Sequence, residues 1–189
     1  MQSRDTIRLA AQCDAAQIAA IYAPIVAGTW ISFEEVPPDE GEMRRRIAAL
    51  AYLFPFLCCE RDGRVAGYAY ATSHRERPAY RWSVDVSAYV HEDYRRGGVA
   101  RSLYGELFTI LSRQGYHNAF AGITLPNDAS VGLHRSLGFV DVAQYRNVGY
   151  KCGAWRDTVW LQRELLAPNG EPREPIPLAL LDAGGQPLD

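Results

Sequence analysis

The chain has 189 residues, a formal charge of −2 and 48% hydrophobic residues, which is typical of a single globular domain. It contains no run of about 18 apolar residues and no apolar signal core near its start, so we expect neither a membrane span nor a secretory leader. The slightly acidic balance argues against nucleic acid as a partner held by bulk charge, but it leaves room for a small basic site.

Strands and helices are expected to alternate along the chain. The hydrophobic spacing predicts strands over residues 7–10, 56–60, 65–72, 82–90, 117–124, 139–146 and 158–164. It also predicts a helix that starts at about Asp14 and three more over about 39–53, 98–114 and 128–137. This order indicates a mixed α/β sheet with helices on both faces.

Local signals refine some of these elements. Asp14 followed by Gln17 predicts a capping box at the start of the first helix, and Pro24 predicts a kink or an end within it. Asp62-Gly63 is a hairpin signal between two strands. The strand over 82–90 alternates, so one face carries Val84, Val86, Ala88 and Val90 and the other Ser83, Asp85, Ser87 and Tyr89.

The composition changes after Leu166. We expect a domain over residues 1–166 and a C-terminal tail over 167–189, in which proline and glycine disfavour regular structure. The short apolar piece over 176–181 is expected to dock on the body or on a second subunit.

The cysteines and histidines do not form a metal motif. CxxC and HxxxH patterns are absent, so we expect no structural zinc site. Cys58 and Cys59 are neighbours in an apolar run and would point to opposite faces of a strand. We interpret them as reduced core residues of a cytoplasmic protein.

The junction of a strand with the long helix is the most informative stretch. It carries Arg95, Arg96 and Arg101 beside Gly97 and Gly98. A helix start offers free N–H groups and a partial positive charge, and glycines let a phosphate approach the backbone. The loop therefore suits a pyrophosphate, although a turn with solvated arginines is the plainer alternative. Walker-type and dinucleotide-binding patterns are both absent here.

A second segment, residues 125–139 (LPNDASVGLHRSLGF), places Asn127 at a strand end before a short helix. With this segment the chain resembles the GNAT superfamily of acetyl-CoA-dependent N-acetyltransferases. Arg95, Gly98 and Ala100 match the superfamily's pyrophosphate loop. Residues 79–90 (AYRWSVDVSAYV), 125–139 and 149–157 (GYKCGAWRD) are similar to runs of its phosphinothricin acetyltransferase-like branch. The resemblance covers about residues 6–165 and implies a splayed central sheet that admits the cofactor.

The resemblance also implies a cofactor site for acetyl-CoA, which is used as a co-substrate. The loop would hold the pyrophosphate, the strand edge would contact the pantetheine arm, and Asn127 would donate a side-chain hydrogen bond. The implied cofactor residues are Ala88, Tyr89, Val90, Arg95, Arg96, Gly97, Gly98, Val99, Ala100, Arg101, Asn127 and Ser130.

Two residues are candidates for the chemistry itself. Asp85 stands where the branch usually has glutamate, and we expect it to act as the base through an ordered water, because an ordinary aspartate is far more acidic than an ammonium group. The alternative is an exposed strand residue. His134 stands where many members carry a tyrosine that protonates the thiolate. Three roles are open for it: to protonate the thiolate, to orient Asn127 or the substrate, or to be a half-buried helix residue without a part in the reaction.

Arg75 and Arg77 precede the strand of Asp85 and are candidates to bind a substrate carboxylate, with Tyr80 beside them; solvated loop arginines are the alternative. The resemblance implies phosphinothricin, methionine sulfoximine or methionine sulfone as the acceptor, and a homodimer. Two other readings are open: acetylation of a protein N-terminus, and a non-catalytic acyl-CoA sensor.

Overall fold

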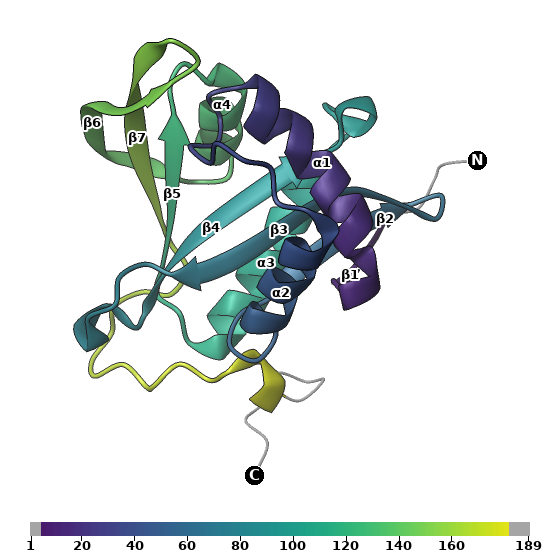
Figure 1. The fold of residues 1–189 in the computed structure, drawn as a ribbon. Helices are drawn as coiled ribbons and strands as arrows, with labels where there is room; N and C mark the ends of the chain where they lie inside the picture. The colour runs from purple at the N-terminus through teal and green to yellow at the C-terminus, as the bar shows by residue number, and fades with distance from the viewer. Residues whose placement is uncertain (1–4, 182–189) are drawn as a thin grey trace.

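One mixed sheet of seven strands organises the chain over residues 5–181, the part that the computed structural model describes. The strand order is β1-β2-β3-β4-β5-β7-β6, in which β4 and β5 are parallel and the other neighbours are antiparallel (Figure 1). The strands are β1 Thr6–Leu9, β2 Phe56–Arg61, β3 Arg64–Ser73, β4 Ser83–Val90, β5 Asn118–Thr124, β6 Val140–Lys151 and β7 Ala154–Glu164.

Helices cover both faces of this sheet, as the sequence predicts. α1 and α2 lie over one face of β2–β4, while α3 crosses the other face and α4 lies beside β5 (Figure 1). No helix in residues 5–181 is long and apolar enough to cross a bilayer. The helices are α1 Ala15–Gly28, α2 Glu40–Leu50, α3 Val99–Gln114 and α4 Asp128–Ser136, with short 3₁₀ turns η1 Gln12–Asp14, η2 Pro78–Tyr80, η3 Glu92–Tyr94 and η4 Leu178–Leu180.

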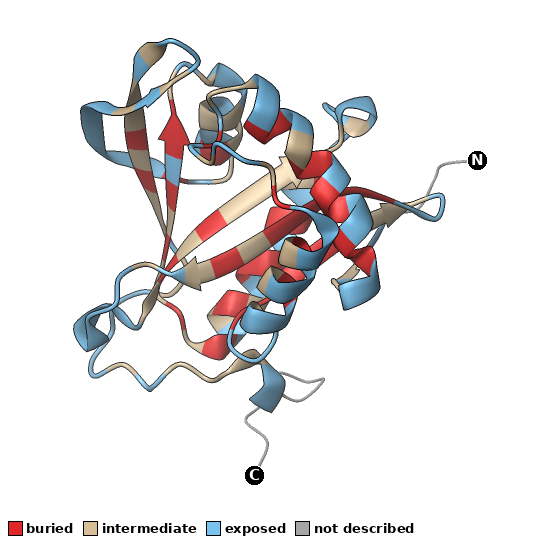
Figure 2. Cartoon of the chain, viewed as in Figure 1, coloured by how far each residue is buried: buried red, intermediate tan, exposed pale blue. Residues whose placement is uncertain are grey.

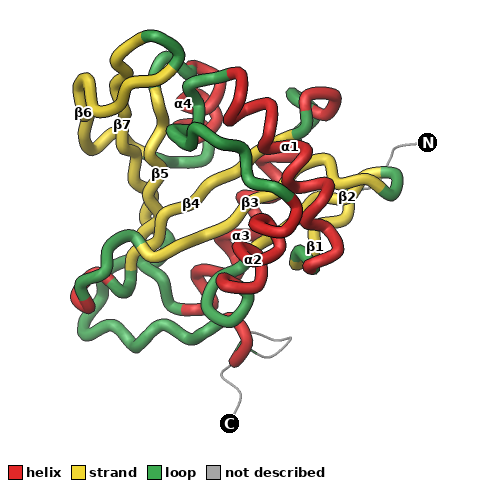
Figure 3. Tube along the Cα trace, viewed as in Figure 1, coloured by secondary structure: helices red, strands yellow, loops and turns green. Residues whose placement is uncertain are grey.

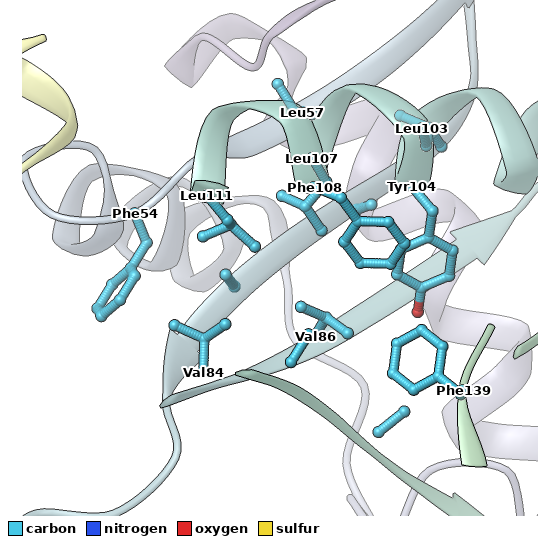
Figure 4. Close-up of a cluster of buried hydrophobic side chains, with 14 of the residues drawn as sticks. Phe54, Leu57, Val84, Val86, Leu103, Tyr104, Leu107, Phe108, Leu111 and Phe139 are labelled. Atoms are coloured by element: carbon cyan, nitrogen blue, oxygen red, sulfur yellow. The ribbon is translucent and has the colours of Figure 1, made fainter. Parts of the chain in front are cut away.

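The sheet separates two hydrophobic cores. On the α3 side, Val84 and Val86 of β4 pack with Leu103 and Leu107 of the helix (Figure 4). On the other side, the inner faces of α1 and α2 pack against β2 and β3. Cys58 and Cys59 are both fully buried and belong to different cores, which confirms that neighbouring strand residues face opposite sides.

The start of α1 differs from the predicted capping box. The Asp14 carboxylate accepts hydrogen bonds from the Ala11 N–H at 2.8 Å and from Arg8 at 2.7 Å. Gln17 turns away and accepts from the Val65 N–H at 3.0 Å. The Asp14 side chain is therefore paired with Arg8 and the Gln17 side chain with a strand N–H, and neither bonds to the other's backbone N–H as in a capping box. The helix does begin directly after Asp14.

Pro24 does not end α1, which continues to Gly28. Ile25 and Val26, in the turn after the proline, are buried against the sheet, and this packing offsets the backbone hydrogen bond that a proline cannot donate.

Two hairpins carry the expected turn chemistry. Asp62 and Gly63 have φ angles of 53° and 75°, as a type I′ turn requires, so the predicted β2–β3 hairpin is confirmed. A second turn, at Cys152 and Gly153 with φ angles of 50° and 74°, joins β6 to β7. Both strands extend to this turn and are longer than their hydrophobic patterns predict.

The first part of the tail lies against the body. The backbone carbonyl of Gln114, at the end of α3, accepts a hydrogen bond from the Ile176 N–H at 2.7 Å. The side-chain amide of Gln114 donates to the Ile176 carbonyl at 2.8 Å. Trp82 donates its indole N–H to the Arg173 carbonyl at 2.7 Å. The segment runs as a loop below the sheet (Figure 3). The end of the expected tail, residues 182–189, lies outside the described residues.

Candidate active site

The junction between β4 and α3 presents free backbone donors. Gly98 is the N-cap of α3 in the left-handed region, with φ 83°, and no side chain caps this helix start. Arg96 is also left-handed, with φ 60°. The first helical bond runs from the Ser102 N–H to the Gly98 carbonyl, so the N–H groups before it point out of the helix. Free backbone donors at the start of a helix of 16 residues are a geometry that suits an anion.

A cleft of about 1070 Å³ opens at this junction, between α1, the end of β4, and the starts of α3 and α4. Every cofactor residue predicted from the sequence except Gly97 lines it. Arg101 is fixed at its edge by a 2.6 Å hydrogen bond from its guanidinium to the Ser136 hydroxyl of α4. The cleft therefore combines two exposed helix starts with arginines, as a diphosphate with a long organic arm would need.

The sheet itself separates beside this cleft. β4 pairs with β5 only from Ser83 to Asp85, opposite Asn118 to Phe120. Beyond Asp85 the two strands diverge, and a small cavity of about 60 Å³ lies between them. Ala88, Tyr89, Tyr104, Asn127, Ser130 and His134 line both this cavity and the cleft. The splayed sheet that the resemblance implies is thus present, with unpaired strand edges where a ligand arm would pass.

A buried pair of side chains closes the cavity. The Tyr104 hydroxyl and the His134 Nε2 are 2.9 Å apart, and His134 Nδ1 lies 2.8 Å from the Ser130 carbonyl, to which it donates. Burial lowers the pKa of His134 and raises the pKa of Tyr104 well above its usual value, so both are neutral at pH 7. The hydroxyl therefore donates to Nε2. Figure 4 shows the Tyr104 hydroxyl pointing away from α3.

Asn127 has a structural task that the sequence interpretation did not assign to it. Its side-chain oxygen accepts from the Ser130 N–H at 3.2 Å and caps α4. Asn127 also lines the cleft. One residue thus fixes the helix start and leaves an N–H₂ group for a ligand.

Asp85 is not a free, exposed strand residue. His74, directly after β3, places its Nδ1 2.6 Å from the Asp85 Oδ1. The imidazole stacks on Phe120 with ring centroids 4.1 Å apart and meets Trp160 edge-on. Burial raises the pKa of the Asp85 carboxyl, and the hydrogen bond from His74 and the charge of Arg75 oppose that rise. A carboxylate in such a partly desolvated site is more basic than one in water.

The three predicted substrate residues lie on the segment between β3 and β4, outside the cleft. The Arg75 guanidinium lies over the Trp160 ring at 5.7 Å, and Tyr80 meets His74 edge-on at 6.1 Å. Arg77 is the exposed residue before η2. The structure thus brings Arg75 and Tyr80 to the Asp85 cluster, while Arg77 stands apart from it.

The segment between α1 and α2 is fixed from the other side of the site. Lys151, at the end of β6, donates to the carbonyl oxygens of Val26, Ser32 and Glu34 at 2.6–2.8 Å. Phe33 packs so closely on Gly149 that a Cβ there would lie 2.5 Å from its ring. These contacts make the loop over 29–36 a fixed wall.

The family follows from a comparison with known domains. The family model of the acetyltransferase (GNAT) domain matches residues 7–160. The chain belongs to the GNAT acetyltransferase family. Phosphinothricin N-acetyltransferase of Alcaligenes faecalis is 44% identical to it over 167 residues, which cover 86% of this chain and 83% of the relative. An L-methionine sulfoximine/L-methionine sulfone acetyltransferase of Salmonella typhimurium is 36% identical, covering 85% of this chain and 94% of the relative.

A solved structure agrees with this GNAT assignment. The GNAT superfamily phosphinothricin acetyltransferase of Sinorhizobium meliloti, determined in complex with acetyl-CoA, superposes with a TM-score of 0.85. It is 33% identical, and the match covers 91% of this chain and 95% of that one.

Several residues of this GNAT site escaped the sequence interpretation. His74 follows a predicted strand without any motif, and only the register of β3 on β4 brings it to Asp85. Trp160 lies in the strand predicted over 158–164, and no motif there marks it as part of a site. Tyr104 lies one position from the inward stripe of α3, and its burial depends on α4, which packs beside that helix.

Proposed function

We propose that this GNAT domain transfers the acetyl group of acetyl-CoA to the amino group of a small amino-acid-like molecule of the phosphinothricin, methionine sulfoximine or methionine sulfone type. The observation that carries the proposal is the separation of β4 from β5 after Asp85, next to the uncapped start of α3. The relatives named above act on such molecules, as their names state.

The cofactor residues would act together on one extended ligand. The N–H groups at the start of α3, with Arg95, Arg96 and Arg101, would hold the diphosphate. The edge of β4 from Ala88 to Val90 and the amide of Asn127 would bind the pantetheine arm. When bound there, acetyl-CoA supplies an activated thioester carbon to the amine.

Asp85 and the Tyr104–His134 pair would handle the protons. Asp85 would be the base, and it would act through an ordered water rather than by direct contact with the ammonium group. The Tyr104 hydroxyl, which donates to His134 Nε2 in the structure, would turn to the departing sulfur at the inner cavity as its hydrogen-bond donor. Arg75, with Tyr80 beside it, would bind the acceptor's carboxylate, and Arg77 would add positive charge at the entrance.

We further propose a homodimer formed through β6. This edge strand is exposed along nearly its whole length (Figure 2). It also carries large apolar side chains. Val140, Tyr150 and, from β7, Trp155 are each at least 60% exposed. Such an edge is an association hazard unless a partner covers it. Sedimentation of the wild type and of V142K tests this: a dimer that V142K dissociates supports it, and a wild-type monomer contradicts it.

A cytoplasmic location is also proposed. The four cysteines are free thiols, and Cys13 and Cys152 are exposed. Exposed thiols persist in a reducing compartment.

Thiol release from acetyl-CoA tests the reaction. The purified chain is assayed with a panel of amino acids that includes phosphinothricin, methionine sulfoximine and methionine sulfone, and the product mass is measured. The proposal predicts an N-acetylated product from at least one of these three. Acetylation of a peptide N-terminus alone would favour the protein-directed activity, and thermal stabilisation by acetyl-CoA without any turnover would favour a sensor.

A further inference from the structure

His74 occupies a position that the register of the sheet makes special. Thr72 of β3 lies opposite Asp85 of β4, and the His74 N–H extends the ladder to the Ser83 carbonyl at 3.4 Å. A residue two places beyond Thr72 is the diagonal neighbour of Asp85 on the same face. The backbone therefore directs this imidazole to the carboxylate.

The imidazole is held in one orientation. Its ring is nearly parallel to Phe120, at 13°, and meets the edges of Tyr80 and Trp160. The side chain is 11% exposed, and that of Asp85 is 29% exposed. A ring clamped between aromatic side chains cannot rotate away from its partner, so the 2.6 Å contact is a fixed feature of the site.

The contact also fixes where the proton sits. A carboxylate only accepts hydrogen bonds, so the proton lies on Nδ1, and the lone pair of the neutral ring lies on Nε2. Within residues 5–181 no hydrogen-bond partner reaches Nε2. The ionisable groups packed around the ring are Asp85 from β4, Arg75 from the same loop and Tyr80 from η2, while β5 and β7 contribute Phe120 and Trp160.

We propose that His74, oriented by Asp85, is the intermediary that accepts the proton from the acceptor's ammonium group. This inference rests on the proposed function, and it assigns to an imidazole the place first given to an ordered water. Asp85 is then a positioning residue, which fixes the tautomer and stabilises the imidazolium, as a carboxylate does in an Asp–His pair. An ordinary imidazole is a stronger base than an ordinary aspartate by roughly 400-fold, so it is the better acceptor for a proton from an ammonium group.

The protons balance over one turnover. Nε2 takes the first proton from the ammonium group, and the free amine forms the new C–N bond at the thioester carbon. The C–S bond breaks as the second N–H proton leaves the nitrogen, and the thiolate departs with that proton as coenzyme A. His74 returns its own proton to solvent before the next cycle.

Two substitutions and a control test the role of His74 in turnover. H74F keeps an aromatic ring to stack on Phe120 but removes both nitrogens, and H117F removes a partly buried histidine that bonds the Leu166 carbonyl. We expect H74F to lower kcat/KM for the amino acid about 100-fold, with acetyl-CoA binding by calorimetry unchanged. H117F should stay within about threefold of the wild type.

A double variant and chemical rescue separate catalysis from packing. Because the two residues act as one unit, H74F/D85N should be no slower than the slower single variant. Added 4-methylimidazole should restore part of the activity of H74A.

Failure of this inference can be told from failure of the proposed function. A wild-type enzyme that acetylates no amino acid contradicts the function. An active wild type whose H74F variant keeps more than a third of its kcat/KM contradicts the role of His74, and so do losses that multiply in H74F/D85N. A readout without turnover is ¹⁵N NMR of labelled histidine at pH 8, where His74 should be the Nδ1–H tautomer and the Nε2–H tautomer would overturn the inference.

Discussion

Asp85 shows how one side chain acquires its chemistry from its neighbours. It is the last residue of β4 that pairs with β5, so it stands where the sheet opens. Its carboxyl is partly desolvated and bonded to His74. The sequence could indicate Asp85 as a candidate base, because its motif resembles that of a known family. It could not identify His74 as its partner, because that contact depends on the register of β3 on β4.

The first prediction at this scale concerns Asp85. D85N keeps the shape of the side chain but can neither hold the His74 tautomer nor stabilise its charge. We expect kcat/KM to fall by about 100-fold or more, while acetyl-CoA binding stays the same. Steady-state kinetics at saturating acetyl-CoA measures this. A fall of less than about threefold would remove Asp85 from the mechanism.

The second concerns Asp14, which has no part in the chemistry. The hydrogen bond from Arg8 lowers the pKa of its carboxyl, against a smaller opposing effect of burial. A lowered pKa means that the ion pair stabilises the fold above about pH 4 and that this stability is lost as the pH falls through the folded-state value. D14N should therefore lower the free energy of unfolding by about 2 kcal/mol at pH 7.

Urea unfolding of both proteins from pH 7 down to pH 3 tests that sign. The gap between the wild type and D14N should be constant near neutral pH and shrink in acid. A gap that grows as the pH falls would contradict the assignment.

At the scale of elements, α3 was the part of the chain that the sequence predicted best. Gly98 and Gly115 mark its two ends in the sequence, and both adopt the left-handed backbone conformation there. The start of α1 was harder to predict. Asp14 and Gln17 have the spacing of a capping box, but their side chains bond to Arg8 of β1 and to the Val65 N–H of β3 instead. Short motifs predict where an element begins better than they predict which tertiary contact its side chains make.

Gly98 and Gly105 form a matched pair on this helix, since a Cβ at either would meet nothing within 4 Å. Gly98 is left-handed, so G98A should destabilise the protein by roughly 1–2 kcal/mol and weaken acetyl-CoA binding about tenfold, because the helix start must shift. Gly105 lies inside the helix, so G105A should stabilise the protein by roughly 0.5–1 kcal/mol and leave binding unchanged. Thermal unfolding and calorimetry of the two variants check this contrast, and equal effects at both sites would refute it.

At the scale of the whole molecule, the described part of the tail, residues 167–181, packs against the body at the end of α3 and contributes no residue to the cleft. Gln114 is fully buried and donates to the carbonyls of Leu53 and Ile176, so it joins α2's end, α3 and the tail. We propose that residues 1–166 hold the whole reaction and that the tail stabilises them. The composition predicted that the domain ends after Leu166. It could not predict the contacts of the tail, because these involve segments far away in the sequence and no local pattern marks them.

Two variants test the tail. Q114A removes both side-chain bonds and should lower the free energy of unfolding by roughly 1–3 kcal/mol. A chain that stops after Leu166 should also melt at a lower temperature. Both should bind acetyl-CoA as the full chain does, because no tail residue described here lines the cleft. Loss of acetyl-CoA binding on truncation would place the tail in the active site.

The fold as a whole was predictable because most strands and helices have a recognisable hydrophobic pattern and because three motifs resemble one branch of a superfamily. The contents of the site were only partly predictable. Residues in the phosphate loop are contiguous, so their spacing shows them. His74, Trp160 and Tyr104 come from different elements and meet only after the sheet has formed.

The most direct test of the account is calorimetric titration of the protein with acetyl-CoA. A diphosphate held by the start of α3, with its arm between β4 and β5, predicts one saturable site per chain that G98A weakens and G105A does not. The absence of any heat of binding at millimolar acetyl-CoA, or binding that G98A leaves unchanged, would contradict it.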